Sequence, residues 1–271
     1  MDKEEIIKIE EIANDLRKNI LQMVYEAKSG HIGGSFSLAE IIACLYFNYL
    51  DIEIDENGKN LKDTVILSKG HASPVIYSAL LKKGILASTK GFRNVETDLE
   101  GHTSNHVPSI PVSTGSLGQG LSIAIGIANA KKLDKKDDKV VCIIGDGEIE
   151  EGQIWEAFLS ASKYNLDNLT IIIDANNIQL DGRVEDIKNI YPIKEKLEGF
   201  NFEIIEIDGH NVLEILEALN GKQNKTKVII ANTIKGKGVS FMQNTSSWHG
   251  KAPNDEEYDR AMKELEMNEQ N

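Results

Sequence analysis

Apolar residues recur every three or four positions along the amino-terminal segment of the chain. They are Ile6, Ile9, Ala13, Leu16, Ile20, Val24 and Ala27. This spacing predicts one long helix with a single apolar stripe, which ends at Ser29-Gly30. A short irregular stretch, His31 to Phe36, follows the glycine. Ser37 is then placed to cap a second helix that runs from Leu38 to about Tyr49.

Beyond a polar loop at 55–62, short apolar runs alternate with helical patterns. The predicted strands are Val65 to Leu67, Val140 to Ile144, Leu169 to Asp174, Phe202 to Ile207 and Lys227 to Asn232. The predicted helices are Pro74 to Lys82, Gly120 to Lys131, Glu151 to Tyr164 and Val212 to Leu219. Apolar strands separated by helices imply a mostly parallel sheet that helices cover on both faces. The expected fold class is therefore α/β, with a doubly wound sheet.

No repeat or low-complexity linker divides the chain, so we expect residues 1–271 to form a single domain. Its length and its 41% hydrophobic content are sufficient for a large core. An acidic tail begins at about residue 254. Its charged residues, which we expect to form a solvated helix face, are Asp255, Glu256, Glu257, Glu264 and Glu266.

The charge balance argues against nucleic acid as a partner. The chain has 43 acidic and 30 basic residues, a net charge of −13, and no basic cluster that would follow a nucleic-acid backbone. Its apolar runs are too short to span a membrane, and its acidic start, 2–5, is unlike a signal peptide. Cys44 and Cys142 lie in apolar segments, as core thiols do. We expect a cytoplasmic protein that binds neither nucleic acid nor membranes.

Two predicted strands end in polar motifs. The first runs into Gly145-Asp146-Gly147, and the second ends in Asn176-Asn177. Ligands of open α/β sheets bind beyond the carboxyl ends of strands, and the intervening helix has the length of a right-handed crossover between neighbouring strands. Asp146 and Asn176 can therefore face each other and, with a free carbonyl, form the oxygen set that Mg²⁺ prefers beside a diphosphate. Each motif alone is typical of a turn; together they favour a ligand site.

These two motifs resemble the thiamin diphosphate fingerprint that many enzyme families share. The continuation Glu151 to Ala157, with the sequence EGQIWEA, resembles transketolase in particular, and the resemblance extends from about Arg17 to Pro253. It implies a thiamin diphosphate-binding fold with bound Mg²⁺, or Ca²⁺ in its place. The metal ligands that the resemblance implies are Asp146, Asn176 and the carbonyl of Ile178.

Four histidines lie in glycine-flanked turns that resemble transketolase loops around the cofactor: His31, His71, His102 and His249. The resemblance implies that His31 and His249 contact the donor's hydroxyls or the diphosphate. It implies that His71 and His102 surround the reacting carbon. Neutral imidazoles can donate to or accept from sugar hydroxyls and relay protons. We assign no catalytic role to the two remaining histidines, at 106 and 210.

Other segments resemble the family in the same order along the chain. The turn from Thr114 to Gly120 opens a helix whose amino end can bind polar groups. The resemblance implies that Gly115 and Leu117 lie near the aminopyrimidine and that Leu180 lies against the thiazolium ring. The cofactor-binding residues implied in total are Lys69, His71, Gly115, Leu117, Gly145, Asp146, Gly147, Glu156, Asn176, Leu180, Lys235 and His249. For Lys69, the sequence is equally consistent with an ordinary surface lysine that does not bind the cofactor.

One glutamate has two possible roles. Glu151 at a helix start ordinarily interacts only with the helix dipole, but the resemblance gives it a position at a subunit interface, beside the neighbouring active site. The catalytic residues implied are then His31, His71, His102, His249 and Glu151.

The resemblance implies transfer of a two-carbon ketol unit from a ketose to an aldose. Transketolases also need a glutamate from a pyrimidine-binding domain, and this sequence ends before such a domain begins. We therefore expect the amino-terminal subunit of a two-chain transketolase, inactive alone, in a heterotetramer of two copies of each chain. The residues of this half of the site do not distinguish a phosphosugar donor from a sulfosugar or another modified ketose. The alternatives are the α-type subunit of a 2-oxoacid decarboxylase or dehydrogenase, and a non-catalytic scaffold subunit.

Overall fold

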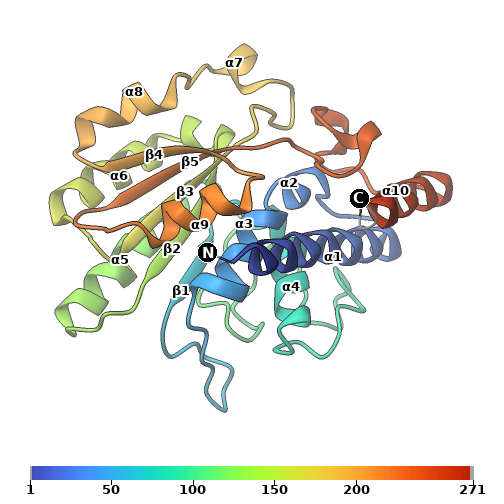
Figure 1. Cartoon of the computed structure of the whole chain (residues 1–271), viewed down its shortest axis with the longest axis horizontal. Helices are drawn as coiled ribbons and strands as arrows, with labels where there is room; N and C mark the ends of the chain where they lie inside the picture. The colour runs from blue at the N-terminus through green and yellow to red at the C-terminus, as the bar shows by residue number, and fades with distance from the viewer. Residues whose placement is uncertain (1, 269–271) are drawn as a thin grey trace.

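Five parallel strands form the centre of the molecule, with helices on both sides (Figure 1). The computed structural model describes residues 2–268. The strands are β1 (Thr64–Leu67), β2 (Val140–Gly145), β3 (Leu169–Ala175), β4 (Glu203–Asp208) and β5 (Lys227–Asn232). Their order in the sheet is β1-β2-β3-β5-β4, and every neighbouring pair is parallel. The predicted α/β class and all five predicted strands are confirmed, with ends that differ by one residue at most.

Ten α-helices flank the sheet in residues 2–268. They are α1 (Lys3–Ala27), α2 (Gly33–Phe36), α3 (Ala39–Cys44), α4 (Ser73–Lys82), α5 (Gln119–Leu133), α6 (Gly152–Tyr164), α7 (Val184–Ile187), α8 (Ile193–Leu197), α9 (Val212–Asn220) and α10 (Asp255–Met267). Successive residues of a strand point to opposite faces of a sheet. In β2, Val141 and Ile143 accordingly belong to one buried cluster, while Cys142 and Ile144 belong to another. The helices α1, α3, α4, α9 and α10 cover the first face, and α5, α6 and α8 cover the second.

The segment after α1 differs from its prediction. The stretch expected to be irregular contains the short helix α2, and the expected helix is divided into α3 and a π-helical turn, Leu45–Tyr49. Ser37 does not cap α3, so that prediction is wrong. Its backbone is already helical, with φ −60° and ψ −28°, and its hydroxyl donates to Asp174 Oδ2 over 2.7 Å. The serine therefore links this segment to the end of β3.

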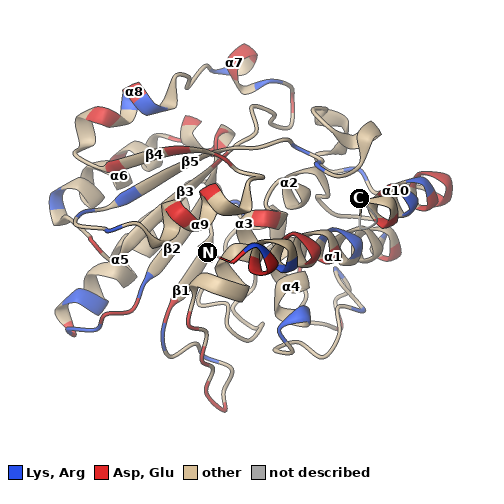
Figure 2. Ribbon diagram, in the orientation of Figure 1, with Lys and Arg blue, Asp and Glu red and all other residues tan. Residues whose placement is uncertain are grey.

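The acidic tail is a helix that packs against α1. Acidic residues gather along α10 in Figure 2. Asp255, Glu256 and Glu266 are exposed, as expected, whereas Glu257 and Glu264 are half-buried. The opposite side of the helix, however, contributes Ala261 and Leu265 to the core, where both are fully buried. Tyr258 stacks on Tyr25 of α1, with the ring centroids 4.2 Å apart. The tail is therefore part of the first hydrophobic layer.

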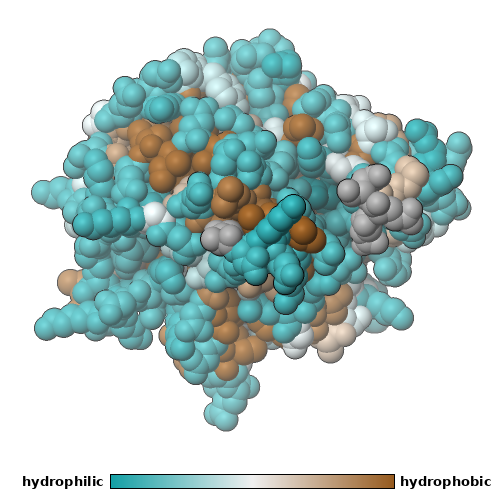
Figure 3. Space-filling view, viewed as in Figure 1, coloured by the Kyte–Doolittle hydropathy of each residue, from teal (hydrophilic) through white to brown (hydrophobic). Residues whose placement is uncertain are grey.

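The edge of the sheet at β4 is less buried than its centre. Ile204 and Ile205 are only half-buried, and Figure 3 shows a hydrophobic patch over this edge on a face that is otherwise largely hydrophilic. Within residues 2–268, no helix is both long and apolar enough to cross a membrane.

The contact of α10 with α1 can be tested by removing one buried side chain. Leu265→Ala should lower the free energy of unfolding by about 2–5 kcal/mol, because it removes buried methyl groups and leaves a cavity between the two helices. Glu266→Ala, one residue further along the exposed side, should change it by no more than about 0.5 kcal/mol. Urea unfolding followed by circular dichroism measures both. Equal stability of the two variants would show that α10 does not dock.

Candidate functional site

Loops at the carboxyl ends of four strands surround one cavity of about 280 Å³. Lys69 follows β1, Asp146 follows β2, Asn176 follows β3, and Lys235 follows β5. The residues that line the cavity are Gly34, Lys69, His71, Leu117, Gly145, Asp146, Gly147, Glu148, Asn176, Ile178, Gln179, Leu180, Asp181, Lys235 and His249. Most of the cofactor and metal residues implied by the sequence are therefore brought to one place.

The four glycine-flanked histidines form a cluster beside this cavity. The ring centroid of His31 lies 5.1 Å from that of His71, 5.3 Å from that of His249 and 6.0 Å from that of His102. The rings of His71 and His249 are 5.1 Å apart. Gly115 lies against the cluster, because a Cβ atom at this position would be 3.2 Å from the His102 ring.

Two of the implied residues lie elsewhere. Glu151 and Glu156 are exposed on α6 and its amino end, and neither lines the cavity. Leu180 does line the cavity but is 62% exposed, so its side chain stands at the rim. The roles that the resemblance gives these three residues stay predictions.

The turn after β2 holds the Asp146 carboxylate in a fixed orientation. Its Oδ1 accepts a hydrogen bond from the Gly147 N–H over 2.8 Å, and its Oδ2 accepts from the Asn177 N–H over 2.5 Å and from the Tyr191 hydroxyl over 2.8 Å. Asn177 can point its N–H at the carboxylate because it adopts a left-handed conformation, φ 56°, which asparagine tolerates. Burial and then the nearby Asp174 charge raise the pKa of Asp146 to about 6. The site therefore favours a cation next to this carboxylate.

Lys235 is a buried cation with no carboxylate partner. It is 2% exposed, and its ammonium donates to the Ile178 carbonyl over 2.9 Å and contacts His249 Nδ1 at 2.8 Å. No carboxylate of residues 2–268 lies within ion-pair distance of it. Burial, followed by repulsion from Lys69, lowers its pKa to about 8. A buried charge without a counter-ion is costly, so this position fits an anionic group such as a diphosphate.

Lys69 is paired, and the surface alternative for it is wrong. It is 3% exposed, forms an ion pair with Asp174, and donates to the Gly34 carbonyl over 3.0 Å. Asp174 is fully buried at the end of β3. Burial opposes its ionisation, but the Lys69 ammonium and hydrogen bonds from neighbouring donors hold the pKa of Asp174 below its usual value. The pair joins the ends of β1 and β3 across β2.

All four histidines of the cluster are neutral at pH 7. Burial is the main cause in each case, and nearby charges add to it. It lowers the pKa of His31 to about 4 and that of His249 to about 3, and the positive charge of Lys235 acts in the same direction. The pKa values of His71 and His102 are also below the usual value. Neutral rings of this kind can both donate and accept hydrogen bonds.

One residue that supports the site, Glu148, was missed by sequence reasoning. Glu148 is buried, and its carboxylate accepts from the Ser68 hydroxyl, the Gly118 N–H and the Gly145 N–H over 2.5, 2.7 and 3.1 Å. It thereby ties together three loops of the cavity. The sequence signal was its position directly after Gly-Asp-Gly, but a glutamate there resembles any acidic residue before a helix.

His210 has a structural position outside the cavity. Its Nε2 accepts from the Ile234 N–H over 2.8 Å, so its Nδ1 carries the proton and donates to Glu40 Oε2 over 3.0 Å. The same oxygen accepts from Arg17 over 2.6 Å. Burial opposes ionisation of Glu40, but Arg17 and His210 lower its pKa to about 2. This buried cluster supports the loop that carries Lys235.

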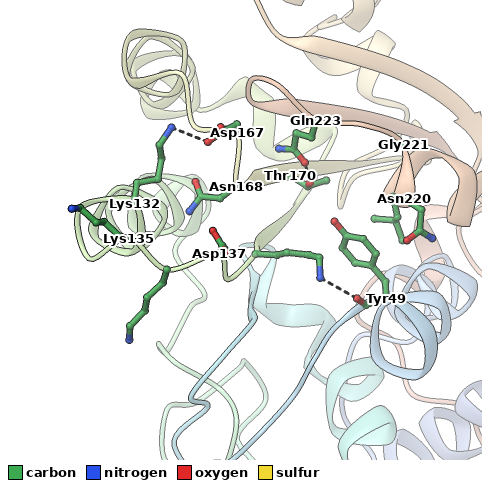
Figure 4. Close-up of a pocket in the computed structure, with 13 residues that line it drawn as sticks. Tyr49, Lys132, Lys135, Asp137, Asp167, Asn168, Thr170, Asn220, Gly221 and Gln223 are labelled. Carbon is green, nitrogen blue, oxygen red and sulfur yellow. Dashed lines mark hydrogen bonds and ion pairs between the residues drawn. The ribbon is translucent and has the colours of Figure 1, made fainter.

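A larger cavity, of about 540 Å³, lies at the opposite, amino ends of the strands (Figure 4). Some of its polar groups pair with one another: Lys132 pairs with Asp167 at 2.8 Å, and Thr170 donates to Gln223 over 3.2 Å. Lys135 is directed away from the centre of the cavity in Figure 4. The cavity holds none of the residues singled out in the sequence, so the smaller cavity is the better candidate for chemistry.

Among residues 2–268, no group of three or more histidine, cysteine, aspartate or glutamate side chains is arranged to hold a metal ion. The predicted magnesium set contains only one such side chain, because its other donors are an amide oxygen and a backbone carbonyl. Asp146, Asn176 and Ile178 all line the same cavity. The carbonyl of Ile178 already accepts from Lys235, so a metal would use its second lone pair.

Comparison with known proteins identifies relatives of the whole chain. The sequence profile of the transketolase thiamine diphosphate-binding domain matches residues 9–271. One subunit of the apulose-4-phosphate transketolase from Phocaeicola vulgatus is 35% identical over 254 residues, which cover 92% of this chain and 90% of that protein. One subunit of the 6-deoxy-6-sulfo-D-fructose transketolase from Clostridium sp. is 38% identical over 269 residues, covering 97% and 98%. Transketolase from Homo sapiens is 37% identical over 255 residues, covering 92% and 41%.

Solved structures agree with these sequence matches. Transketolase from Campylobacter jejuni superposes with a TM-score of 0.87 at 31% identity, covering 98% of this chain and 43% of that one. Transketolase from Leishmania mexicana gives a TM-score of 0.87 at 26% identity, covering 95% and 41%. The chain thus spans about two fifths of the length of full-length transketolases and nearly the full length of the two relatives that are named as transketolase subunits.

The fold and the cavity therefore define a thiamin diphosphate-binding domain of the transketolase type. The chain belongs to the transketolase family, as the segment from Glu151 to Ala157 and the histidine turns led us to expect.

The unpaired lysine gives a direct test of anion binding. Lys235→Met should weaken binding of thiamin diphosphate, and of inorganic pyrophosphate, about 10- to 100-fold, since a charge-assisted hydrogen bond contributes about 1.5–3 kcal/mol. Lys237→Met is the matched control, because Lys237 is a nearby lysine that does not line the cavity. Isothermal titration calorimetry with Mg²⁺ present measures all three proteins. A loss of the same size in both variants would contradict a specific role for Lys235.

Proposed function

We propose that this chain is the amino-terminal, diphosphate-binding subunit of a two-chain transketolase, which transfers a two-carbon ketol unit from a ketose to an aldose. The observation that carries the proposal is the cavity at the carboxyl ends of the strands. There, the buried and unpaired ammonium of Lys235 lies beside a cluster of four neutral histidines. The relatives of matching length are named as subunits of transketolases, which supports the division into two chains.

We assign the metal site to Asp146, Asn176 and the Ile178 carbonyl, with Mg²⁺ as the metal. This assignment is supported by the hard oxygen donors that these residues offer on one wall of the cavity. The hydrogen bonds from Asn177 and Tyr191 orient the Asp146 carboxylate before any metal arrives. Such preorganisation reduces the ordering that metal binding requires.

The residues of this chain bind and orient in the proposed reaction. Thiamin diphosphate, when bound, supplies the nucleophilic carbon and the electron sink for cleavage of the ketose. Lys235 would offset part of the negative charge of the diphosphate. The neutral rings of His31 and His249 hydrogen-bond to donor hydroxyls or the diphosphate, and those of His71 and His102 hold or move protons next to the reacting carbon. A neutral imidazole suits this work, because it can accept a proton that an imidazolium cannot.

The partner, in this proposal, is a chain with a pyrimidine-binding domain that supplies the activating glutamate. Glu151 and Glu156 are exposed in this chain. In the proposed assembly, the partner covers them. Leu180 stands exposed at the rim, where it would meet the ring system of the cofactor. We propose a heterotetramer with two copies of each chain and two active sites.

The donor is proposed to be an anionic ketose. The two relatives of matching length act, by name, on a sugar phosphate and a sulfosugar, which share a strongly acidic group. The competing 2-oxoacid decarboxylase would need no cluster of histidines for sugar hydroxyls, and a scaffold would need no buried, unpaired lysine.

The assignment of the metal predicts the effect of one substitution. Asp146→Ala should abolish Mg²⁺-dependent binding of thiamin diphosphate, because it removes the one carboxylate of the proposed ligand set. Asp181→Ala is the control, since Asp181 is a carboxylate on the same cavity outside that set. Calorimetric titrations with and without Mg²⁺ give the comparison. Unchanged affinity in Asp146→Ala would place the metal elsewhere.

The activity itself is tested by reconstitution. The chain mixed with a pyrimidine-binding transketolase subunit should transfer ketol from a ketose phosphate or from 6-deoxy-6-sulfo-D-fructose, with the ratio of kcat/KM values identifying the donor. The chain alone should show no turnover. Turnover by the chain alone would refute the need for a partner. Failure with every ketose, despite bound cofactor, would leave the 2-oxoacid and scaffold alternatives.

A further inference from the structure

One buried carboxylate collects hydrogen bonds from four side chains, three of which come from distant segments of the chain. Asp174 Oδ2 accepts from the Ser37 hydroxyl over 2.7 Å, from the Lys69 ammonium, and from the Asn176 side-chain amide over 3.0 Å. Its Oδ1 accepts from the Thr233 hydroxyl. Asp174 is fully buried and does not line the cavity, whereas Asn176 does. The carboxylate therefore lies directly behind one wall of the site.

The contacts of Asn176 fix which end of its amide faces Asp174. An ionised carboxylate only accepts hydrogen bonds, so the amide nitrogen must be the atom that meets it. On the other side, the amide oxygen accepts from the Ile178 N–H over 3.1 Å, and an N–H only donates. The reversed amide would place oxygen against oxygen and nitrogen against nitrogen, so that both contacts would be lost. The two neighbours select the same orientation.

We propose that Asp174 is a positioning residue for the metal: it holds the Asn176 amide with its oxygen, and not its nitrogen, toward the cation. This inference rests on the metal site proposed above. The amide oxygen keeps a second lone pair after bonding to Ile178, and that lone pair is the one offered to the metal. An asparagine free to rotate would present a nitrogen that carries two hydrogens and cannot bind Mg²⁺.

The other contacts of Asp174 serve this task. Ser37 and Thr233 bond to different oxygens of the carboxylate and so fix its plane. Lys69 balances its negative charge, so the carboxylate can remain ionised while fully buried. A neutral side chain of the same shape would carry its own N–H donors and could accept the amide in either orientation.

The test is a double-substitution cycle on positions 174 and 176, read out as the Mg²⁺ concentration needed for thiamin diphosphate binding. Asp174→Asn should weaken the apparent Mg²⁺ affinity about 10- to 100-fold, as loss of a partner behind a metal ligand typically does. Saturating Mg²⁺ should restore cofactor binding. Asn176→Asp alone should also weaken Mg²⁺ binding, because it sets two carboxylates against each other.

The double variant Asp174→Asn with Asn176→Asp should regain most of the lost affinity. Its carboxylate at 176 presents an oxygen in either orientation, and the amide at 174 can donate to it. Thr233→Val is the matched control: it removes one donor from the same carboxylate but leaves the contact with Asn176, so the Mg²⁺ dependence should stay within about threefold of the wild type. Calorimetry and the Mg²⁺-dependent rise in the thermal unfolding midpoint give two readouts that do not require turnover.

Each outcome decides between the two proposals. A wild-type protein whose cofactor binding does not depend on Mg²⁺ refutes the metal site itself. Mg²⁺ dependence in the wild type that is unchanged in Asp174→Asn, or two single losses that simply add in the double variant, refutes the positioning role. If Asp174→Asn does not fold, the comparison of Asn176→Asp with the double variant decides, and only recovery in the double variant supports the proposal.

Discussion

The ion pair between Lys69 and Asp174 is the contact on which the candidate site depends. The two residues follow β1 and end β3, the two strands that flank β2 in the sheet, so their contact closes over the strand that carries Asp146. Both side chains are out of water, and such a pair is tolerated only where further hydrogen bonds satisfy it. Ser37, Thr233 and the Gly34 carbonyl supply those bonds. The loops of the cavity are consequently held by one polar network and not by apolar packing alone.

This network also sets the electrostatics of the cavity. Because Asp174 neutralises Lys69, the positive charge left for an incoming anion is that of Lys235. The same lysines help to keep His31, His71 and His249 neutral, since a second positive charge nearby would be repelled. The Lys235 ammonium in the cavity and the neutral imidazole rings in and beside it therefore do not compete for protons. A diphosphate and a polyhydroxylated sugar need these two different environments side by side.

The features that could be predicted from the sequence are those that local residue patterns and the order of the strands determine. Asp146 and Asn176 were placed together because polar motifs at the ends of neighbouring parallel strands must meet. Asp174 was missed, since it reads as the last residue of an apolar strand, and three of its partners come from distant segments. Tyr191 was also missed, because Asp146, the residue to which it donates, is 45 positions away in the sequence. The cap at Ser37 failed because its backbone is already helical at the end of α2, and its hydroxyl donates to Asp174 instead. Cytoplasmic location and the sugar substrate leave no mark on the fold and stay predictions.

The end of the cavity near Asp146 and Asn176 is enclosed by residues of this chain, whereas the end near Leu180 is open. Within residues 2–268, residues of this chain donate hydrogen bonds that orient Asp146, Asn176 and Asp174, so the proposed diphosphate end of the site is preformed in this chain. The end near Leu180 is open, and the two glutamates of α6 are exposed. A cofactor held here by its diphosphate would therefore have its ring system uncovered until a second protein surface closes over it. In this proposal, binding of the diphosphate rests on residues of this chain, among them Asp146 and Lys235, whereas activation requires the wall of the cavity that a partner supplies.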